Sequence, residues 1–362
     1  MFCFIDPEKD LTMPNWFSRL IGREEKASVP PGLIALQFGA RAAWSPRDIP
    51  ALMREGYERN AITHRCVRLI AEAAAAVPLK ASDPAAQKLI DHPNPDQSGP
   101  ELWESFYGFL QLAGNAYLEL ASLEGEPREL FILRPDRLRV LPGPRGWPQG
   151  WEYAVDGRKR VFERDPVSGR APIFHIKLFH PGDDYYGLSP IQAAARALDL
   201  HNAGGEWAKA LLDNAARPSG ALVFNSGDGR MSEEQFNRLK RELAEDHAGP
   251  TNAGRPMLLE GGLDWKPMAL SPADMDFTAA RREAAREIAL AFGVPPLLLG
   301  LPGDNTYANY REANLAFWRQ TVSPLTGKLA RALAVWLRPW FGPDLQIEAD
   351  QSGVPGLKEL EQ

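Results

Sequence analysis

Apolar residues recur every three or four positions along several stretches of the chain, which is the spacing of one face of an α-helix. In residues 272–293 this face includes Ala284 and Ile288. The other faces of the same stretch are charged and carry Arg281, Arg282, Glu283, Arg286 and Glu287. Pro295 and Pro296 end the pattern, because proline has no N–H to donate and disfavours helical geometry in the residue before it. The spacing therefore predicts a helix with one packed stripe and a charged exterior.

Similar spacing predicts four further helices, at residues 58–77, 99–113, 190–216 and 310–341, the last kinked at Pro324. Six short runs rich in β-branched and aromatic residues predict strands: 116–120, 129–133, 138–141, 151–155, 160–164 and 173–178. Turn residues separate these runs, so we expect them to form one small antiparallel sheet.

Residues 217–271 interrupt the helical pattern. They hold a strand at 221–224, a helix from Ser232 to about Glu245 and two strands near Gly261 and Gly262. This alternation predicts a compact α/β insertion between two long helices. The last residues, 343–362, combine a possible strand at 345–349 with a polar tail, and residues 1–49 are expected to be a partly mobile arm.

Composition limits the possible functions. The chain has 362 residues, 44% of them hydrophobic, and a formal net charge of −6. Lys and Arg are spread along it, which argues against tight nucleic-acid binding. Its two cysteines, Cys3 and Cys66, lack metal-type spacing. No run reaches the roughly 18 apolar residues of a membrane span, so we expect no membrane partner.

The sequence offers little catalytic chemistry. Ser189 lies between Gly187 and Pro190, but the proline after it cannot supply the N–H that an oxyanion hole needs. We therefore interpret Ser189 as a helix cap. No phosphate-binding glycine motif is present. We expect no cofactor, no metal site and no enzymatic activity.

Some histidine, aspartate and aromatic residues could form metal or base-stacking sites, but each group also has a simpler structural interpretation. His175 and His180 are five residues apart, so on a strand they point to opposite faces. Aspartates could hold magnesium for a nuclease, and the candidates are Asp183, Asp184, Asp274 and Asp276. The aromatic residues Trp103, Phe106, Tyr107 and Phe109 fit a helix core better than base stacking. Two candidate functions stay open beside the one that the motifs below indicate. One is a metal-dependent DNA-processing enzyme, and the other is a structural capsid or tail protein without a channel.

The order of several motifs resembles that of tailed-bacteriophage portal proteins, the head-to-tail connectors, including those of gene transfer agents. The motifs are LAGNAYLEL at 112–120, GLSPI at 187–191, RPSG at 217–220, NAGRPMLLEGG at 252–262 and EIALAFGVPPLLLG at 287–300, followed by TYAN at 306–309. The resemblance implies an α+β portal fold and a dodecameric ring at one capsid vertex, through which DNA enters and leaves.

The resemblance also implies a division of the chain. The parts would be an arm at 1–49, a wing at 50–189, stem helices at 190–216 and 272–293, a clip at 217–271, a tunnel-loop region at 294–309, wing or crown-base helices at 310–342 and a tail at 343–362. The implied partners are other copies of the chain, double-stranded DNA, terminase, a head-tail adaptor and the major capsid protein. Assembly would take place in the bacterial cytoplasm.

Specific residues follow from this division. The DNA-facing loop would contain Gly303, Asp304, Asn305, Thr306 and Tyr307, and the clip would contain Trp265 and Lys266. Arg281, Arg282 and Arg286 alternate with Glu283 and Glu287, so we expect them to pair within or between subunits rather than to grip phosphates.

Overall fold

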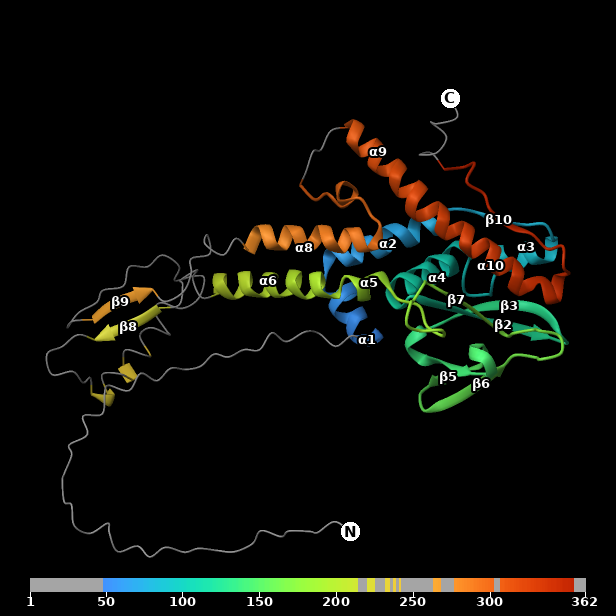
Figure 1. Cartoon of the computed structure of the whole chain (residues 1–362), viewed down its shortest axis with the longest axis horizontal. Coiled ribbons are helices and arrows are strands. Elements are labelled where there is room, and N and C mark those ends of the chain that lie inside the picture. The colour runs from blue at the N-terminus through green and yellow to red at the C-terminus, as the bar shows by residue number, and fades with distance from the viewer. Residues whose placement is uncertain are drawn as a thin grey trace, which may run out of the picture. The chain divides into compact units, whose positions relative to one another are not determined.

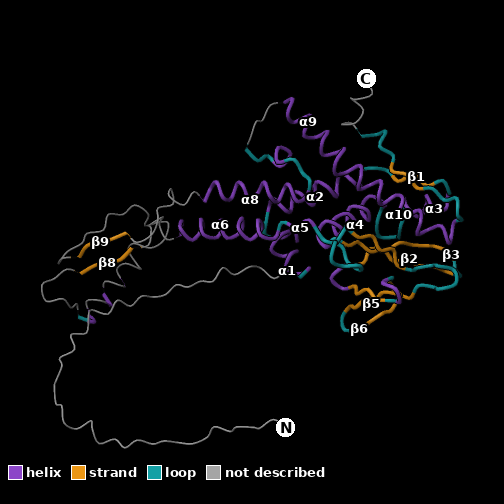
Figure 2. Tube along the Cα trace, in the orientation of Figure 1, coloured by secondary structure: helices purple, strands orange, loops and turns teal. Residues whose placement is uncertain are grey.

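The computed structural model describes residues 48–213, 220–224, 232–234, 237–238, 241, 263–267, 277–302 and 307–354. Figure 1 and Figure 2 show the arrangement of helices and strands in these ranges. The arm predicted at 1–49 lies outside them except for its last two residues, as does most of the predicted insertion. No helix among the described residues is long and apolar enough to cross a membrane.

Two of the predicted helices pack against each other. They are α2 (Ala61–Ala75) and α4 (Gly99–Ala113). A capping box of Ser98 and Glu101 begins α4, and Gly114 in the left-handed conformation ends it. Trp103, Phe106 and Tyr107 are buried on its inner face, which confirms their interpretation as core residues.

The strands form two sheets rather than the single sheet predicted. One has the order β3-β2-β7 and the other β4-β5-β6, both antiparallel. The strands are β2 (Asn115–Leu123), β3 (Glu126–Leu133), β4 (Leu138–Pro142), β5 (Pro148–Val155), β6 (Arg158–Glu163) and β7 (Ile173–Lys177). The single-sheet prediction was wrong, because β4, β5 and β6 pair with one another and not with the outer edge of β3 or β7. The sheet β4-β5-β6 packs against the sheet β3-β2-β7 through a second core cluster that includes Tyr117, Val140 and Trp151.

A small helix-and-strand unit was not predicted. The strand β1 (Leu79–Ala81) pairs antiparallel with β10 (Ile347–Ala349), and α3 (Pro84–Asp91) follows β1. The strand β10 confirms the run predicted at 345–349. Two short helical segments before α2 were also missed, α1 (Ile49–Leu52) and the π-helical η2 (Met53–Glu58).

The C-terminal helix is interrupted close to the predicted kink. It consists of α9 (Tyr307–Phe317), the π-helical η7 (Trp318–Val322) and α10 (Ser323–Phe341). Pro324 lies in the first turn of α10. Because proline has no N–H to donate, the regular hydrogen-bond ladder cannot continue through it, and the wider turn of η7 precedes the break.

The remaining elements are the long helices that flank the predicted insertion in the sequence, the short 3-10 turns, and two strands of the insertion itself. The first long helix is divided into α5 (Pro190–Ala193) and α6 (Ala195–Asp213), and the second is α8 (Phe277–Phe292). A 3-10 turn, η6 (Pro296–Leu299), occupies the strip after the two prolines. The other 3-10 turns are η3 (Pro135–Arg137) and η4 (Pro144–Gly146). Within the insertion, the structure has the strands β8 (Gly220–Phe224) and β9 (Leu263–Pro267) where strands were predicted, and the two pair antiparallel.

Candidate functional site

Helices α6 and α8 lie side by side, in yellow-green and orange in Figure 1. The buried face of α8 consists of Ala284, Ala285, Ile288, Ala289 and Phe292. On α6, Gly204 allows a close approach, since a Cβ added there would lie 2.9 Å from Cγ of Arg281. The neighbouring Gly205 would meet the same guanidinium at 3.7 Å. Arg281 therefore extends across a glycine pair of the facing helix, which sequence spacing did not predict.

A buried asparagine joins α6 to the helices before it. Asn60 is 2% exposed, and its Oδ1 accepts hydrogen bonds from the backbone N–H groups of Ile62 and Thr63, both at 3.1 Å. Its Nδ2 donates to Oδ1 of Asn202 at 2.8 Å and contacts Nδ1 of His201 at 3.0 Å. One side chain thus caps α2 and also holds α6.

The protonation of His201 follows from this geometry. Asn60 Oδ1 is already an acceptor, so its Nδ2 must be the donor and His201 Nδ1 the acceptor. The imidazole is then neutral, with its proton on Nε2. Burial lowers the pKa of His201, and the positive charge of Arg281 lowers it further.

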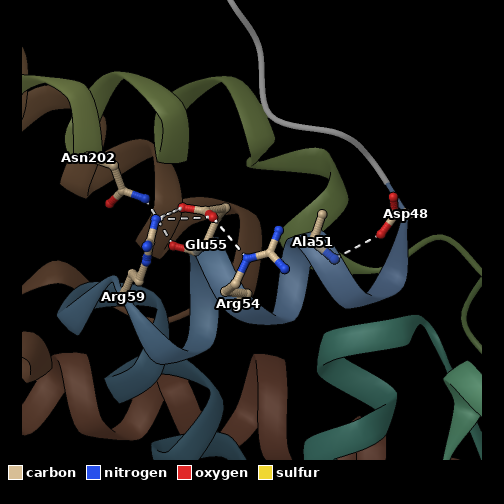
Figure 3. Close-up of polar contacts among 6 residues, drawn as sticks. All are labelled: Asp48, Ala51, Arg54, Glu55, Arg59 and Asn202. Atoms are coloured by element: carbon tan, nitrogen blue, oxygen red, sulfur yellow. Dashed lines mark hydrogen bonds and ion pairs between the residues drawn. The ribbon is translucent and has the colours of Figure 1, made fainter.

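The π-helical turn completes the attachment of α6. Asn202 Nδ2 donates to the main-chain oxygen of Glu55 at 2.9 Å. Figure 3 shows the Glu55 carboxylate between Arg54 and Arg59, with ion-pair distances of 3.2 Å and 3.1 Å. Gly56 in the same turn faces Ile191, and a Cβ there would lie only 2.2 Å from Cδ1 of that side chain. Close packing and polar contacts therefore fix α5 and α6 to this turn.

The exposed face of α8 is charged and has few partners among the described residues. Arg282, Glu283 and Glu287 are exposed, and Leu290 is 79% exposed beside them. Arg286 approaches Glu283 at 3.9 Å, the only ion pair that the described residues give to this group of charges. The same Arg286 donates through Nη2 to the main-chain oxygen of Pro302. Most of the predicted pairing is therefore not made within the described part of the chain.

The end of α8 is fixed to the π-helical turn η7. Gly293 has a left-handed backbone with φ of +68°, and a Cβ there would lie 2.9 Å from Oγ1 of Thr321. Thr321 Oγ1 donates to the main-chain oxygen of Gly293 at 2.6 Å. Thr321 thus satisfies a carbonyl at the end of α8.

The predicted loop and clip residues are only partly described. Gly303, Asp304, Asn305 and Thr306 lie outside the described residues, and Tyr307 is the first residue of α9. In the clip, Trp265 lies opposite Leu222 and Lys266 opposite Ala221 in the β8–β9 ribbon. Their roles stay predictions.

The residues weighed for catalysis have structural roles where they are described. Ser189 accepts a hydrogen bond from the backbone N–H of Gln192 at 3.2 Å, which confirms it as a helix cap. His175 Nε2 contacts Asn115 Oδ1 at 3.1 Å, and burial lowers the His175 pKa to about 3. Asp183 accepts from the backbone N–H groups of Tyr185 and Tyr186.

No metal-binding cluster is formed by the described residues. Among them, no three His, Cys, Asp or Glu side chains come together in a way that could hold a metal ion. Asp184 is exposed, and Asp274 and Asp276 lie outside the described ranges.

Comparison with known proteins identifies the family. The family described as phage portal protein matches residues 61–358. The chain belongs to the phage portal protein family. An uncharacterized protein of Rickettsia bellii is 38% identical to it over 314 residues, covering 84% of this chain and 81% of that protein.

Two solved structures are more similar still. A chain in the virion of a native gene transfer agent particle has 53% identity and a TM-score of 0.68, with 89% of each chain covered. A chain in the neck of a native gene transfer agent particle, computed with C12 symmetry, has 53% identity, a TM-score of 0.68 and 88% coverage of each chain. The portal fold and the family that the motif order indicated are thereby confirmed.

Proposed function

We propose that this portal protein forms a twelve-membered ring at the head-tail neck of a phage or gene transfer agent particle. The ring would be a channel through which DNA is packaged and released. Family membership and the likeness to a particle neck with C12 symmetry support this proposal. In this arrangement α6 and α8 are the two stem helices.

The exposed surface of the helix pair is the observation that carries the proposal. On α8, Leu290 lies exposed next to Glu283 and Glu287, and on α6, Leu200 is 49% exposed near Arg196. Leu200 and Leu290 remain in water in the single chain, and Arg282 and Glu287 of α8 form no ion pair with the described residues. Contacts between the exposed face of α8 in one subunit and α6 in the next would bury both leucines and pair opposite charges.

The charge of the chain suits a channel through which DNA slides. Each firm phosphate contact would add affinity and slow movement along the duplex. The subunit has a formal net charge of −6, so a ring of such subunits carries a large negative charge. Repulsion from all sides of the ring would keep the DNA duplex centred and would prevent firm binding. We infer that Asn305, Thr306 and Tyr307 approach the duplex from a loop.

The insertion would face the particle's other components. We infer that residues 217–271, with Trp265 and Lys266 on β9, bind terminase during packaging and the head-tail adaptor afterwards. The wing at 50–189 would contact the major capsid protein. A variant without the insertion should lose binding to terminase and adaptor, and retained binding of both would contradict the assignment.

Ring formation is tested first by images and mass. Negative-stain micrographs of purified particles should show rings with a central hole, whereas a channel-less scaffold protein would show none. Glu287→Arg should lower the fraction of complete rings in native mass spectrometry, because the reversed charge meets an unfavourable partner across the interface. Glu104→Arg, an exposed change on α4, is the matched control. An unchanged ring mass in Glu287→Arg contradicts the interface.

The loop assignment needs a separate assay. Deleting residues 303–307 should leave rings intact but reduce the yield of packaged, nuclease-protected DNA. Normal yield in the deletion variant would contradict the loop's role without affecting the ring proposal. DNA cleavage by the purified protein that depends on added magnesium would favour a nuclease instead.

A further inference from the structure

A groove of about 1030 Å³ lies away from the helix pair, beside strand β7 and helix α10. Its walls include Trp147 and Trp151 at the second sheet, residues 173–175 and Lys177 of β7, and Val335 and Trp336 of α10. A volume of this size is at the upper end of the range for ligand pockets, enough for several residues of a peptide. No residue of α6 or α8 lines this groove.

The apolar side chains of the groove are incompletely covered. Trp147 is 75% exposed and Val335 is 60% exposed. Trp336 donates its indole N–H to the main-chain oxygen of Ala171 at 2.7 Å, so that side chain is satisfied. Trp151, in contrast, is 1% exposed and lies beneath the groove.

The rim of the groove is positively charged. Arg164 and Arg331 line it, are exposed and have no ion-pair partner within the described part of the chain. Arg164 lies over the Trp151 ring, 5.9 Å from its centroid. Lys177 donates to the main-chain oxygen of Asp184, the only acidic residue among those lining the groove. The lining of the groove thus holds three cationic side chains and one carboxylate, and this excess of positive charge favours an acidic occupant.

One wall of the groove is the edge of a sheet. In the order β3-β2-β7, strand β7 pairs only with β2 among the described strands. The main-chain groups on its other side therefore have no strand partner among the described residues, and four residues of β7 line the groove. The Lys177 oxygen accepts a hydrogen bond from Lys328 Nζ at 2.7 Å, which leaves the edge before it for a peptide. An extended peptide can add to such an edge, gaining affinity from main-chain hydrogen bonds and specificity from alternating side chains.

These features together identify an occupant. We infer that the groove binds an acidic, extended peptide segment of another protein, which adds as a strand beside β7. Its apolar side chains cover Trp147 and Val335, and its carboxylates pair with Arg164 and Arg331. The inference concerns a surface outside the channel and holds whether or not the ring closes.

The test uses the full chain and two labelled peptides of alternating residues, each about six residues long. One alternates glutamate with valine, and the other alternates lysine with valine. Fluorescence anisotropy at about 0.15 M salt should show that the wild-type protein prefers the glutamate peptide at least about tenfold. Hydrogen exchange of the bound protein should show added protection of the amides at 173–177.

Charge reversal separates the groove from general electrostatics. The double variant Arg164→Glu/Arg331→Glu should lose the glutamate peptide and gain affinity for the lysine peptide. The control Arg128→Glu/Arg158→Glu changes the net charge equally at exposed sites outside the groove and should keep the wild-type preference. The control carries the same added negative charge, so a gain for the lysine peptide in the groove variant alone comes from the groove.

Four outcomes would overturn the inference, three of them with the wild-type protein and the control variant. Those three are failure of the wild-type protein to prefer the glutamate peptide, equal loss of preference in the control variant, and binding without protection at 173–177. The neutral variant Arg164→Gln/Arg331→Gln should bind both peptides weakly, and wild-type affinity for the glutamate peptide in this variant would also overturn it.

Discussion

Removing the Asn60 side chain should loosen α6 from the rest of the protein. In Asn60→Ala the cap of α2 is lost, which costs about 1 kcal/mol. The side chains of His201 and Asn202 also lose their shared donor, at about 1–3 kcal/mol when such groups are fully buried. Both are only partly buried, so water recovers some of that loss. We expect the free energy of unfolding to fall by about 2–3 kcal/mol.

Asn60→Asp is the informative partner variant. Its carboxylate keeps the two backbone N–H acceptor contacts but has no proton to donate to His201 or Asn202. A carboxylate beside the imidazole favours the charged form and raises the His201 pKa. A histidine whose pKa is higher in the folded protein than in the unfolded chain stabilises the fold when it is protonated. This stabilisation is complete at pH values below the unfolded pKa and is lost as the pH rises through the folded pKa. Asn60→Asp should therefore approach wild-type stability on acidification, whereas Asn60→Ala should not.

Urea denaturation followed by far-UV circular dichroism, at one fixed subunit concentration and a series of pH values, measures both effects. A loss below about 0.5 kcal/mol in Asn60→Ala would refute the bridging role. Parallel pH profiles for the two variants would refute the assigned protonation of His201.

Three further predictions follow from single contacts. Because burial lowers the His175 pKa to about 3 from the ordinary 6.5, stability should fall as pH drops through that window, and urea denaturation of His175→Gln should show a flatter profile. Gly293→Ala should lower the melting temperature more than Gly300→Ala. Both have positive φ, but only the first Cβ would meet Thr321. Ser189→Ala should cost about 1 kcal/mol in the same urea assay, and no change would contradict its capping role.

Local signals explain where sequence reasoning succeeded. The bounds of α4 were predicted as residues 99–113, because the stop and start signals lie next to the helix. A Ser98–Glu101 capping box precedes it and Gly114 follows it. The strand β9 and the split of the C-terminal helix near Pro324 were likewise marked by glycine or proline in the sequence.

Contacts between distant residues explain where it failed. The three-residue strands β1 and β10 pair across most of the chain, and strands this short carry too little alternation to identify a partner. Two sheets replaced one because the sequence does not say that β7 returns to β2. The π-helical turn η2 follows no hydrophobic period of its own. Asn60 lies inside the helix predicted at residues 58–77, so it was not identified as the cap of α2. Its hydrogen bond to α6 joins residues about 140 positions apart, which no local pattern indicates.

The contacts of α8 suggest why its sequence is so highly charged. The buried stripe and Arg281 attach this helix to its neighbours, and Thr321 and Arg286 fix the segment that follows it. Two of its remaining charges, Arg282 and Glu287, form no ion pair with the described residues, and exposed ion pairs within one chain stabilise little. Arg282 and Glu287 therefore add little to the stability of the single chain, and Leu290 beside them is exposed. Contacts with other subunits would explain why these residues are present. Charge reversal at Glu287 should therefore affect assembly while leaving the folding of the single chain nearly unchanged.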